Sequence, residues 1–359
     1  MGATEFATTD AQAVKRWSNS LAREAISKTF FRRFLGKGPN SIIQQHTDLE
    51  SAAGDQIKYD VIMQNRGDGV QGDTTLENYE EELEFYQATI NIDQLRNAVS
   101  FRRMSQQRTL HNLRKEARSV LSDWFAWKYD TLMFAYLAGV AGDDLETASG
   151  TIGASGFAGN ALTDYSSDTA HHIDESAGGG NSSFGLEILD VAKAKAKTLN
   201  PRLRPVMVNG SPKFVAVLHP YSVHTLRRET GANGWTEIHS RVADGGSKSP
   251  IYTGALGEYN GIVLHESEYI PRTTSTGDTA NLFLGAQAAS FAMGNAYDKT
   301  DQSSNGGGSY FSWNEQKNDY GNKKGIAAGS CFGIQRNIFN GDSFGTLLLE
   351  TVQTTPAVS

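Results

Sequence analysis

The sequence has one cysteine, few prolines and no long apolar run. Its 359 residues include 8 prolines and a single cysteine, Cys331, which excludes an internal disulfide framework and any Cys-x-x-Cys motif. No stretch approaches the ~20 apolar residues that a membrane-spanning helix requires, and the first residues lack the apolar segment of a secretory signal. With 20% charged and 10% aromatic residues, the composition predicts a folded protein that is made in a reducing cytoplasm and does not contact a membrane.

Acidic and basic residues are concentrated in different segments. The net charge is −7, yet residues 1–40 contain seven basic and three acidic residues, and residues 101–140 contain the same numbers. Between them, residues 41–100 contain twelve acidic and three basic residues. This alternation fits contacts between subunits, in which complementary charges set register and encounter rate. It fits equally well with separate faces that contact only water.

Residues 54–101 have the pattern of a long two-stranded ribbon. Ile57, Tyr59 and Val61 alternate with polar residues, and a second alternating segment begins at Phe85. A polar, glycine-rich tip and an acidic run lie between the two segments. A two-stranded ribbon is marginally stable alone, and its open edges favour pairing with another chain. We therefore expect this ribbon to lie across an adjacent subunit.

Two segments have the apolar spacing of amphipathic helices. Residues 11–35 carry an apolar stripe and precede a Gly-Lys-Gly-Pro stop. Residues 105–137 contain no glycine or proline and have apolar residues at three- and four-residue steps. The second helix would be roughly 50 Å long at 1.5 Å per residue. Its predicted stripe comprises Leu110, Leu113, Ala117, Val120, Trp124 and Trp127.

The rest of the sequence mixes helix and strand patterns without strict alternation, which predicts an α+β fold. Residues 139–184 are rich in Gly, Ser, Thr, Ala and Asp and predict a long surface insertion. Residues 325–339 fit a helix or a strand equally well. We expect further helices at 186–199, 221–229 and 235–242, and strands at 205–208, 214–218, 261–265, 282–293, 310–314 and 346–352.

Two glycine motifs suggest chemistry but lack the context that it requires. Gly67–Gly72 has the spacing of a dinucleotide-binding turn, yet glutamates follow it in place of a helix N-terminus. Gly341–Gly345 matches a Gly-x-Ser-x-Gly nucleophile turn, but a strand pattern follows and no histidine occurs after His265. Neither motif supports an enzyme.

His171, His172 and Glu175 form the best candidate metal-binding group in the sequence. Two imidazoles and a carboxylate can bind zinc, so a metal-dependent hydrolase is a remote alternative. These residues lie in the Gly/Ser-rich insertion, where the sequence offers no framework to fix ligand geometry. We expect an exposed polar loop here, and we expect the protein to have no catalytic residues, metal ion or cofactor.

Short motifs spread from about residue 14 to residue 351 together resemble one protein family. In the C-terminal half they are Pro250–Glu266, Leu284–Ala288, Trp313-x-Glu315, Asp319–Asn322, Gly333–Arg336 and Phe339–Gly345. In the first 240 residues they are Ser41–Gln44, Thr47–Glu50, Gly67–Gly69, Asp93-Gln94, Arg204-Pro205, His219-Pro220, Leu226-Arg227 and Trp235. This set resembles the tailed-bacteriophage major capsid proteins typified by phage N-four.

The resemblance implies a Hong Kong 97-like major capsid protein fold of the α+β class. The implied layout is an N-terminal arm at 1–50, an extended β-ribbon loop at 51–104, and the spine helix of a peripheral domain at 105–140. It continues with a surface insertion at 141–184, an axial domain at 185–280, and a return to the peripheral domain at 281–359.

The implied function is self-assembly, as pentamers and hexamers, into an icosahedral virion shell around double-stranded DNA. The implied partners are other copies of the chain, a portal, a separate scaffolding protein, a decoration protein at the 141–184 insertion, and DNA contacted without sequence preference. The nearest alternative is a bacterial nanocompartment shell of the same fold.

The ribbon and the start of the spine helix are the expected contact regions between subunits. Some relatives of this fold are cross-linked through a lysine in the extended loop. Lys58 is the only lysine between residues 41 and 100 and lies near the ribbon base, so we expect no such cross-link. The expected contact residues are Ile57, Tyr59, Val61, Arg66, Asp68, Asp73, Phe85, Arg102 and Arg103.

Overall fold

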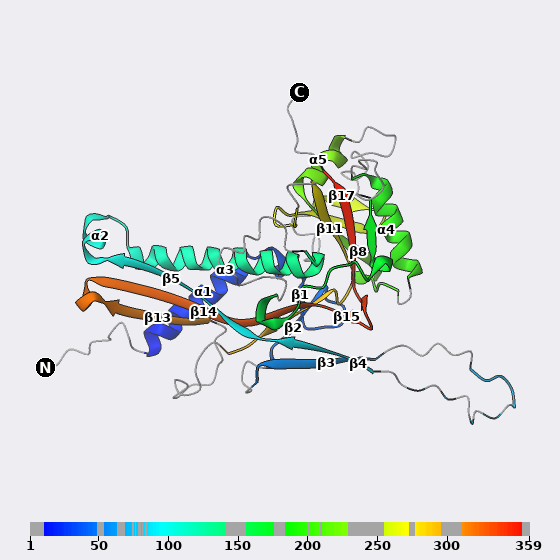
Figure 1. Cartoon of the computed structure of the whole chain (residues 1–359), viewed down its shortest axis with the longest axis horizontal. Coiled ribbons are helices and arrows are strands. Elements are labelled where there is room, and N and C mark those ends of the chain that lie inside the picture. The colour runs from blue at the N-terminus through cyan, green and yellow to red at the C-terminus, as the bar shows by residue number, and fades with distance from the viewer. Residues whose placement is uncertain are drawn as a thin grey trace.

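The chain forms two large β-sheets, a long helix and a separate two-stranded ribbon, as the computed structural model shows (Figure 1). Helices and strands mix without a regular alternation, which confirms the predicted α+β class. Among the described residues, no helix is long and apolar enough to cross a membrane. The structure describes residues 11–48, 54–62, 69–73, 75, 77, 80, 82, 85–140, 156–175, 184–199, 202–208, 210–228, 255–272, 277–295 and 311–353, without the side chains of 11–19, 61 and 62.

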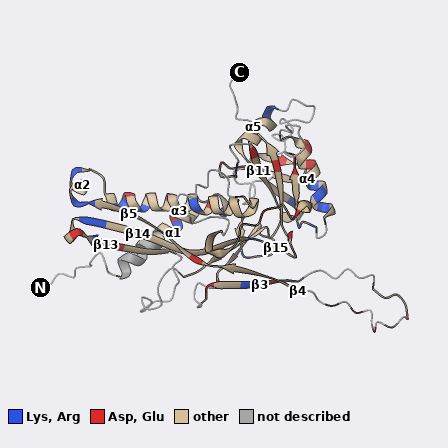
Figure 2. Cartoon of the chain, in the orientation of Figure 1, with Lys and Arg blue, Asp and Glu red and all other residues tan. Residues whose placement is uncertain are grey.

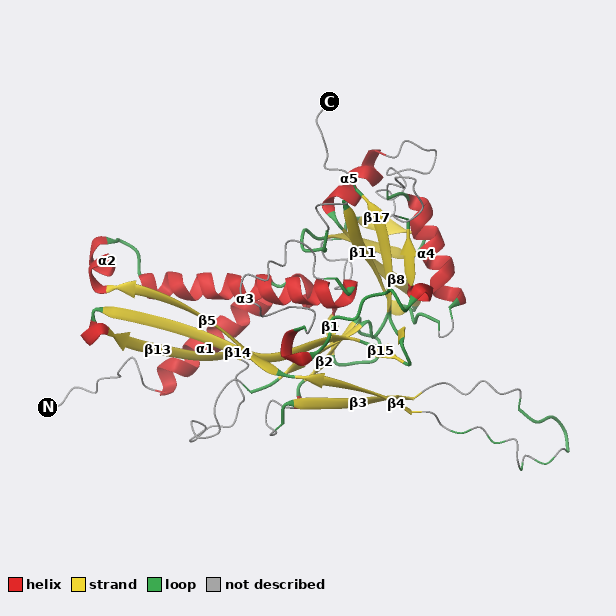
Figure 3. Cartoon of the chain, in the orientation of Figure 1, coloured by secondary structure: helices red, strands yellow, loops and turns green. Residues whose placement is uncertain are grey.

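A six-stranded sheet lies beside helix α3 (Leu113–Ala138), as Figure 3 shows. Its longest strand, β14 (Lys323–Arg336), pairs antiparallel with β5 (Asp93–Arg102), β13 (Phe311–Asn318) and β12 (Ala289–Met293). Strands β2 (Ile43–His46) and β1 (Leu35–Gly36) extend the sheet beyond β12. The segment 325–339, which its sequence left undecided, is therefore largely a strand with neighbours on both edges.

Helix α3 is capped at both ends, by Asn112 and by Gly139. The Asn112 side chain accepts hydrogen bonds from the backbone N–H groups of Arg114 and Lys115 at 3.2 and 3.4 Å, as an N-cap residue does. The helix ends at Gly139, whose φ of 71° is the left-handed conformation that glycine adopts without strain. A Cβ atom there would lie 2.4 Å from the carbonyl oxygen of Thr163. Both conformation and space therefore require glycine.

The predicted helix at 105–137 is wrong in its first part, because the chain forms two helices. Helix α2 (Arg103–Arg108) ends before Asn112 caps α3, so α3 has 26 residues and is about 39 Å long. The predicted stripe is also partly wrong. Leu110, Val120 and Trp127 are 104%, 56% and 39% exposed. The buried face instead follows Ala117, Leu121, Phe125 and Tyr129 at four-residue steps.

The second large sheet has seven strands, and helices α4 (Leu186–Thr198) and α5 (Pro220–Arg228) lie beside it (Figure 1). The sheet order is β6-β17-β11-β8-β10-β9, and β7 pairs with β8. The bounds are β6 His172–Asp174, β7 Val206–Val208, β8 Ser211–Leu218, β9 Gly257–Tyr259, β10 Ile262–Glu266, β11 Asp278–Leu284 and β17 Thr346–Val352.

This second sheet corrects two sequence-based expectations. The predicted strand at 282–293 is two strands, β11 and β12, which belong to different sheets. Between them the chain turns at Ala286 and Gln287; at the preceding Gly285, a Cβ atom would lie 2.5 Å from the carbonyl oxygen of Arg204. Strand β17, expected in the peripheral sheet with the rest of 281–359, instead lies between β6 and β11. The boundary predicted at residue 280 therefore does not separate the two sheets.

Residues 156–175, within the predicted surface insertion, are packed against the rest of the chain. Phe157 and Tyr165 are buried in the main core, and β6 pairs with β17. The Asn160 amide donates to the carbonyl oxygen of Asn91 and accepts from its backbone N–H, both at 2.9 Å. The expectation of an exposed loop is wrong here because a few buried anchors sit in a sequence of mostly small and polar residues.

The N-terminal segment is part of the main core. Helix α1 (Ala11–Lys28) is followed by a short 3-10 helix, η1 (Phe30–Phe34), and then by β1 and β2 of the six-stranded sheet. Leu21, Phe31 and Ile43 are buried with the core residues of α3. The predicted helix at 11–35 is thus correct as far as Lys28.

Candidate intersubunit surfaces

The base of the projecting ribbon packs against its own chain. Strands β3 (Gln56–Ile62) and β4 (Phe85–Asn91) pair antiparallel. Ile57 is 6% exposed and clusters with Ile90 and Ala292. The Tyr59 hydroxyl lies 2.6 Å from Asn337 Oδ1, and burial raises the pKa of Tyr59 to about 12. We expected Ile57 and Tyr59 to contact a second subunit, but both side chains have partners within the chain.

The outer part of the ribbon carries the predicted contact residues that remain accessible. Phe85 is 56% exposed at the start of β4, and Asp73 is exposed beyond the paired strands. The side chain of Val61, and Arg66 and Asp68 as a whole, lie outside the described residues.

A basic surface lies at the opposite end of the molecule, where α2 meets the turn between β13 and β14 (Figure 2). We call this surface, residues 102–110 and 317–324, the distal tip. The backbone N–H of Arg103 donates to the Asn322 carbonyl oxygen at 2.8 Å, which joins its two halves. Its exposed basic residues are Arg102, Arg103, Arg108, Lys317, Lys323 and Lys324.

Only two of these six residues were predicted from the sequence. Arg102 and Arg103 were expected at a subunit contact, whereas Lys323 and Lys324 gave no such signal. The register of β5 on β14 places Lys323 opposite Arg102, although the two are more than 200 residues apart in the sequence. Sequence reasoning missed the cluster because only this long-range pairing creates it.

The distal tip also exposes apolar side chains. Met104, Leu110 and Tyr320 are 52%, 104% and 111% exposed. Tyr320 lies in a one-turn 3-10 helix, η7 (Asp319–Gly321), and Tyr320 and Asp319 have φ values of 50° and 54°. Non-glycine residues in this conformation cost of order ~1 kcal/mol each. The turn is therefore strained and presents a fully exposed aromatic ring.

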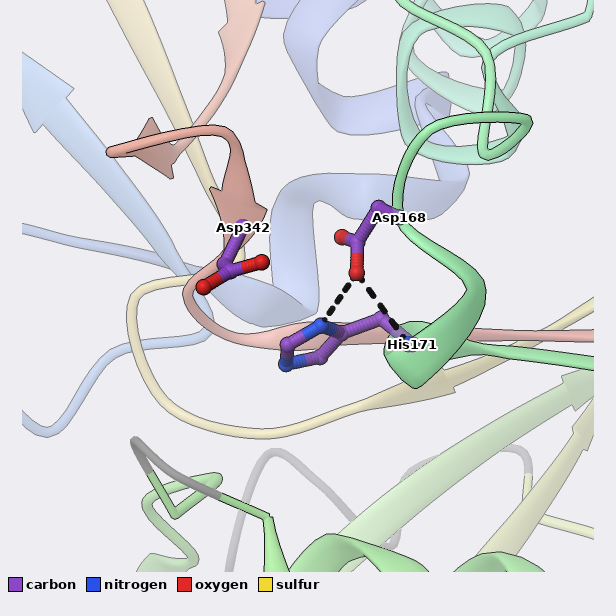
Figure 4. A group of neighbouring side chains, drawn as sticks. All are labelled: Asp168, His171 and Asp342. Atoms are coloured by element: carbon purple, nitrogen blue, oxygen red, sulfur yellow. Dashed lines mark hydrogen bonds and ion pairs between the residues drawn. The ribbon is translucent and has the colours of Figure 1, made fainter.

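Asp168, His171 and Asp342 form a partly buried group of carboxylates and imidazole near strand β16 (Asp342–Ser343), as Figure 4 shows. Asp168 Oδ1 lies 2.7 Å from His171 Nδ1, and Oδ2 accepts from the backbone N–H of Ser343 at 2.8 Å. Burial raises the pKa of Asp168, but hydrogen bonds from His171 and Ser343 outweigh it and lower the pKa to about 2. His171 Nε2 lies on the side of the ring away from Asp168 (Figure 4). These hydrogen bonds occupy both carboxylate oxygens of Asp168. Asp168 therefore joins the segment around His171 to strand β16.

The three residues of the hydrolase alternative do not converge on one site. His171 pairs with Asp168, whereas His172 Nε2 lies 2.9 Å from Glu350 Oε2. Glu175 belongs to neither of the two carboxylate–imidazole groups found among the described residues. Consecutive histidines therefore face different carboxylates, and each stabilises a separate contact.

Asp130 attaches the N-terminal segment to α3. Its carboxylate accepts hydrogen bonds from the backbone N–H groups of Phe30 and Phe31 at 2.7 and 3.3 Å, which are free at the start of η1. Burial raises the pKa of Asp130 to about 7, despite these bonds and the nearby Arg33 guanidinium. The contact between α3 and η1 thus depends on the Asp130 carboxyl group, whose charged form is disfavoured by burial.

The chain is similar to capsid proteins of bacteriophages over its whole length. A profile of the family described as phage capsid protein matches residues 5–353. The major capsid protein of Pseudomonas phage KPP25 is 27% identical over 389 aligned residues, which cover 96% of each chain. The capsid of Ralstonia phage GP4 is 31% identical, with a TM-score of 0.79 and 100% of both chains covered. The capsid of cyanophage Pam1 shares the fold, with a TM-score of 0.67 at 17% identity over 91% of this chain and 93% of that one.

These similarities favour the capsid interpretation over the nanocompartment and hydrolase alternatives. The folds of the Ralstonia and cyanophage capsids confirm the expected Hong Kong 97-like fold. The chain therefore belongs to the phage capsid protein family and is a structural major capsid protein of the tailed-phage type.

Proposed function

We propose that this capsid protein assembles as pentamers and hexamers into a closed icosahedral shell around double-stranded DNA. The observation that carries the proposal is the ribbon β3–β4, which forms a two-stranded sheet of its own at the edge of the body (Figure 1). Among the described residues, no third strand pairs with β3 or β4, so their outer edges can pair with a neighbouring copy. Contacts that join one surface of a subunit to a different surface of the next one close into rings.

A shell of this kind needs interfaces whose free energy exceeds the cost of association. Obligate interfaces bury on the order of 2,000 Å². If half of that area is apolar, burial contributes ~25 kcal/mol at ~25 cal/mol per Å², against association costs of roughly 4–15 kcal/mol. The exposed Phe85, Val120 and Trp127 side chains are apolar surface that such interfaces would cover.

The proposal includes partners beyond the chain itself. We infer a separate scaffolding protein and a portal during assembly, a decoration protein at residues 141–184, and synthesis in the host cytoplasm before incorporation into the virion. The excess of basic residues in 101–140 supports contact with DNA phosphates without sequence preference. We further infer that the protein is not an enzyme, since its histidine–carboxylate pairs stabilise loops.

Deleting the ribbon tip tests the assembly role. Removing Arg66–Asp73 should leave a soluble, folded chain that forms no closed shells, as seen by negative-stain electron microscopy of purified material. Deletion of Ser176–Ser183, which has the same length, is the matched control and should leave shells intact. Normal particles from the first deletion would reject the role of the tip.

A further inference from the structure

A buried histidine nitrogen near strand β16 has no hydrogen-bond partner. His171 is 1% exposed, and its Nε2 atom has no donor or acceptor within reach among the described residues. A buried polar atom without a partner costs about 1–3 kcal/mol, and folded proteins leave few of them unsatisfied. A group that the chain itself does not supply would therefore bind favourably at this nitrogen.

Asp168 holds the imidazole ring in one orientation. Its Oδ1 accepts from the backbone N–H of His171 at 3.2 Å and lies 2.7 Å from Nδ1 of the same residue. Because an ionised carboxylate can only accept, Nδ1 carries the proton, and Nε2 of the neutral ring keeps its lone pair. A carboxylate bound to one ring nitrogen is the usual support of a histidine whose other nitrogen binds a metal ion.

A second carboxylate lies beside this pair. Asp342 of β16 is half-buried, and its side chain approaches the Asp168–His171 pair (Figure 4). One ring nitrogen of His171 and one oxygen from each carboxylate lie within 4.8 Å of one another.

The charges of this group favour a cation over a neutral ligand such as water. Among the described residues, no ion pair joins Asp168 or Asp342 to a lysine or an arginine. Lys195 interacts with Asp168 only through longer-range electrostatics. Charges that are removed from water are normally paired or bound to a metal ion. A divalent cation would balance both carboxylates and accept the lone pair of Nε2.

The mixture of nitrogen and oxygen donors indicates the class of cation. Imidazole nitrogen suits Zn²⁺ and related transition-metal ions, whereas Mg²⁺ and Ca²⁺ prefer sites made of oxygen alone. Both oxygens of Asp168 already accept hydrogen bonds, from His171 and from the backbone N–H of Ser343. Asp168 is therefore suited to orient His171, and Asp342 is the carboxylate that remains available as a ligand.

We propose that His171 Nε2 and the Asp342 carboxylate bind one divalent transition-metal ion such as Zn²⁺, with Asp168 as the positioning residue. This inference goes beyond the proposed assembly function, and it departs from our expectation, based on the sequence, that the protein holds no metal ion. Water completes the coordination from the half-buried side of Asp342. The ion is structural and takes part in no reaction.

The ion joins two segments that lie beneath the ribbon. His171 directly precedes β6 of the seven-stranded sheet, and Asp342 lies in the hairpin of β15 (Ile338–Phe339) and β16, which follows β14. Phe339 of this hairpin contacts the Tyr59 ring of the ribbon edge-on, with 6.3 Å between the ring centroids. Metal binding therefore fixes the hairpin against which the ribbon base packs.

Zinc binding by the unassembled chain tests the site. The purified chain, stripped with a chelator and equilibrated with micromolar ZnCl2, should retain about one zinc ion per chain by elemental analysis. His171→Ala and Asp342→Asn should each lower the zinc affinity by about a hundredfold or more, since loss of a ligand costs at least as much as loss of its support. His172→Ala is the matched control and should bind zinc normally, because His172 faces Glu350 instead.

Two further measurements separate binding from a purely structural role. Asp168→Asn should weaken zinc binding by ~10–100-fold yet still reach the same stoichiometry at saturation, because both ligands remain. Zinc should also slow amide exchange in residues 338–343 of the unsubstituted chain and not in Asp342→Asn. That variant keeps the size of a half-buried side chain, and circular dichroism checks that it is folded.

The following outcomes would overturn the proposal. They are an unsubstituted chain that retains no zinc, an unchanged zinc affinity in both His171→Ala and Asp342→Asn, and a loss of binding in His172→Ala alone. Tighter binding of MgCl2 or CaCl2 than of ZnCl2 would exclude the histidine nitrogen as a ligand. Zinc binding that leaves amide exchange in residues 338–343 unchanged would show that the ion does not fix the hairpin.

Discussion

Replacing Asp130 with asparagine should stabilise the protein at pH 8 and weaken it slightly at pH 4. The Asp130 carboxyl group is 3% exposed and holds the start of η1 through the N–H groups of Phe30 and Phe31. Arg33 on η1 favours its charged form, and Tyr269 interacts with it electrostatically. Burial outweighs the attraction to Arg33 and raises the pKa of Asp130 from 3.8 to about 7.

The sign of the pH dependence follows from this shift. A carboxyl group whose pKa is raised on folding binds more protons in the folded state, so its contribution to stability is greatest below pH ~4. Stability then falls as the pH rises to about 7. The total change has a ceiling of ~4 kcal/mol, at ~1.36 kcal/mol for each pH unit of the shift. Asparagine removes this dependence but loses one acceptor for the η1 amides, which costs ~1 kcal/mol.

Urea unfolding of the unassembled chain between pH 4 and 8 measures this effect. The Asp130→Asn curve should cross the unsubstituted curve within that range and lie ~2–3 kcal/mol above it at pH 8. Asp130→Ala is the control for the hydrogen bonds, and it should speed amide exchange at Phe30 and Phe31 at every pH. A constant stability difference between the Asn variant and the unsubstituted chain from pH 4 to 8 would refute the reasoning.

Three further outcomes are expected from other parts of the structure. Asp168→Asn should destabilise the chain by ~2 kcal/mol at pH 7, because a pKa of about 2 means that the charged form is favoured on folding. This contribution is lost as the pH falls from ~4 towards 2, so the stability difference between the variant and the unsubstituted chain, measured by unfolding, should vanish there. Gly139→Ala should lower the melting temperature more than Gly321→Ala does, since both have positive φ but only Gly139 has a backbone atom within 3 Å of a new Cβ; equal losses would contradict the steric argument. Lys58→Arg should leave the gel pattern of boiled particles unchanged, whereas a ladder of covalent oligomers that is lost in this variant would show a lysine cross-link.

Local patterns were enough to predict many of the elements. The alternation around Ile57 identifies β3, and the apolar spacing after Asn112 identifies α3. These elements depend on periodicities that are visible within a few residues. Local patterns did not predict where these elements end or which of their faces is buried. The Asn112 cap divides the predicted 105–137 helix, and the position of the sheet, which no local pattern specifies, decides that Val120 is exposed and Leu121 buried.

Contacts between distant segments were the main source of error. The distal tip requires Lys323 to lie beside Arg102, and Asp168 requires Ser343 as a hydrogen-bond donor. Neither pair leaves a trace in the local sequence of either partner. His171 was expected on an exposed loop because glycine and serine surround it. It is buried, and the residues beside it contact strands made much later: Asp168 accepts from Ser343 of β16, and His172 pairs with β17.

The positions of β14 and β17 have a consequence for the order of folding. Each lies inside its sheet, and the ribosome makes each only after all the strands that it joins. Neither sheet can close while those last strands are still in the exit tunnel, and such long-range pairing is intrinsically slow. A chain terminated before β14 would lack the strand that joins β5, β12 and β13, and one terminated before β17 would lack the strand that joins β6 to β11. We therefore expect chains that end before β14 to lack the six-stranded sheet on which the ribbon packs, and not to enter a growing particle.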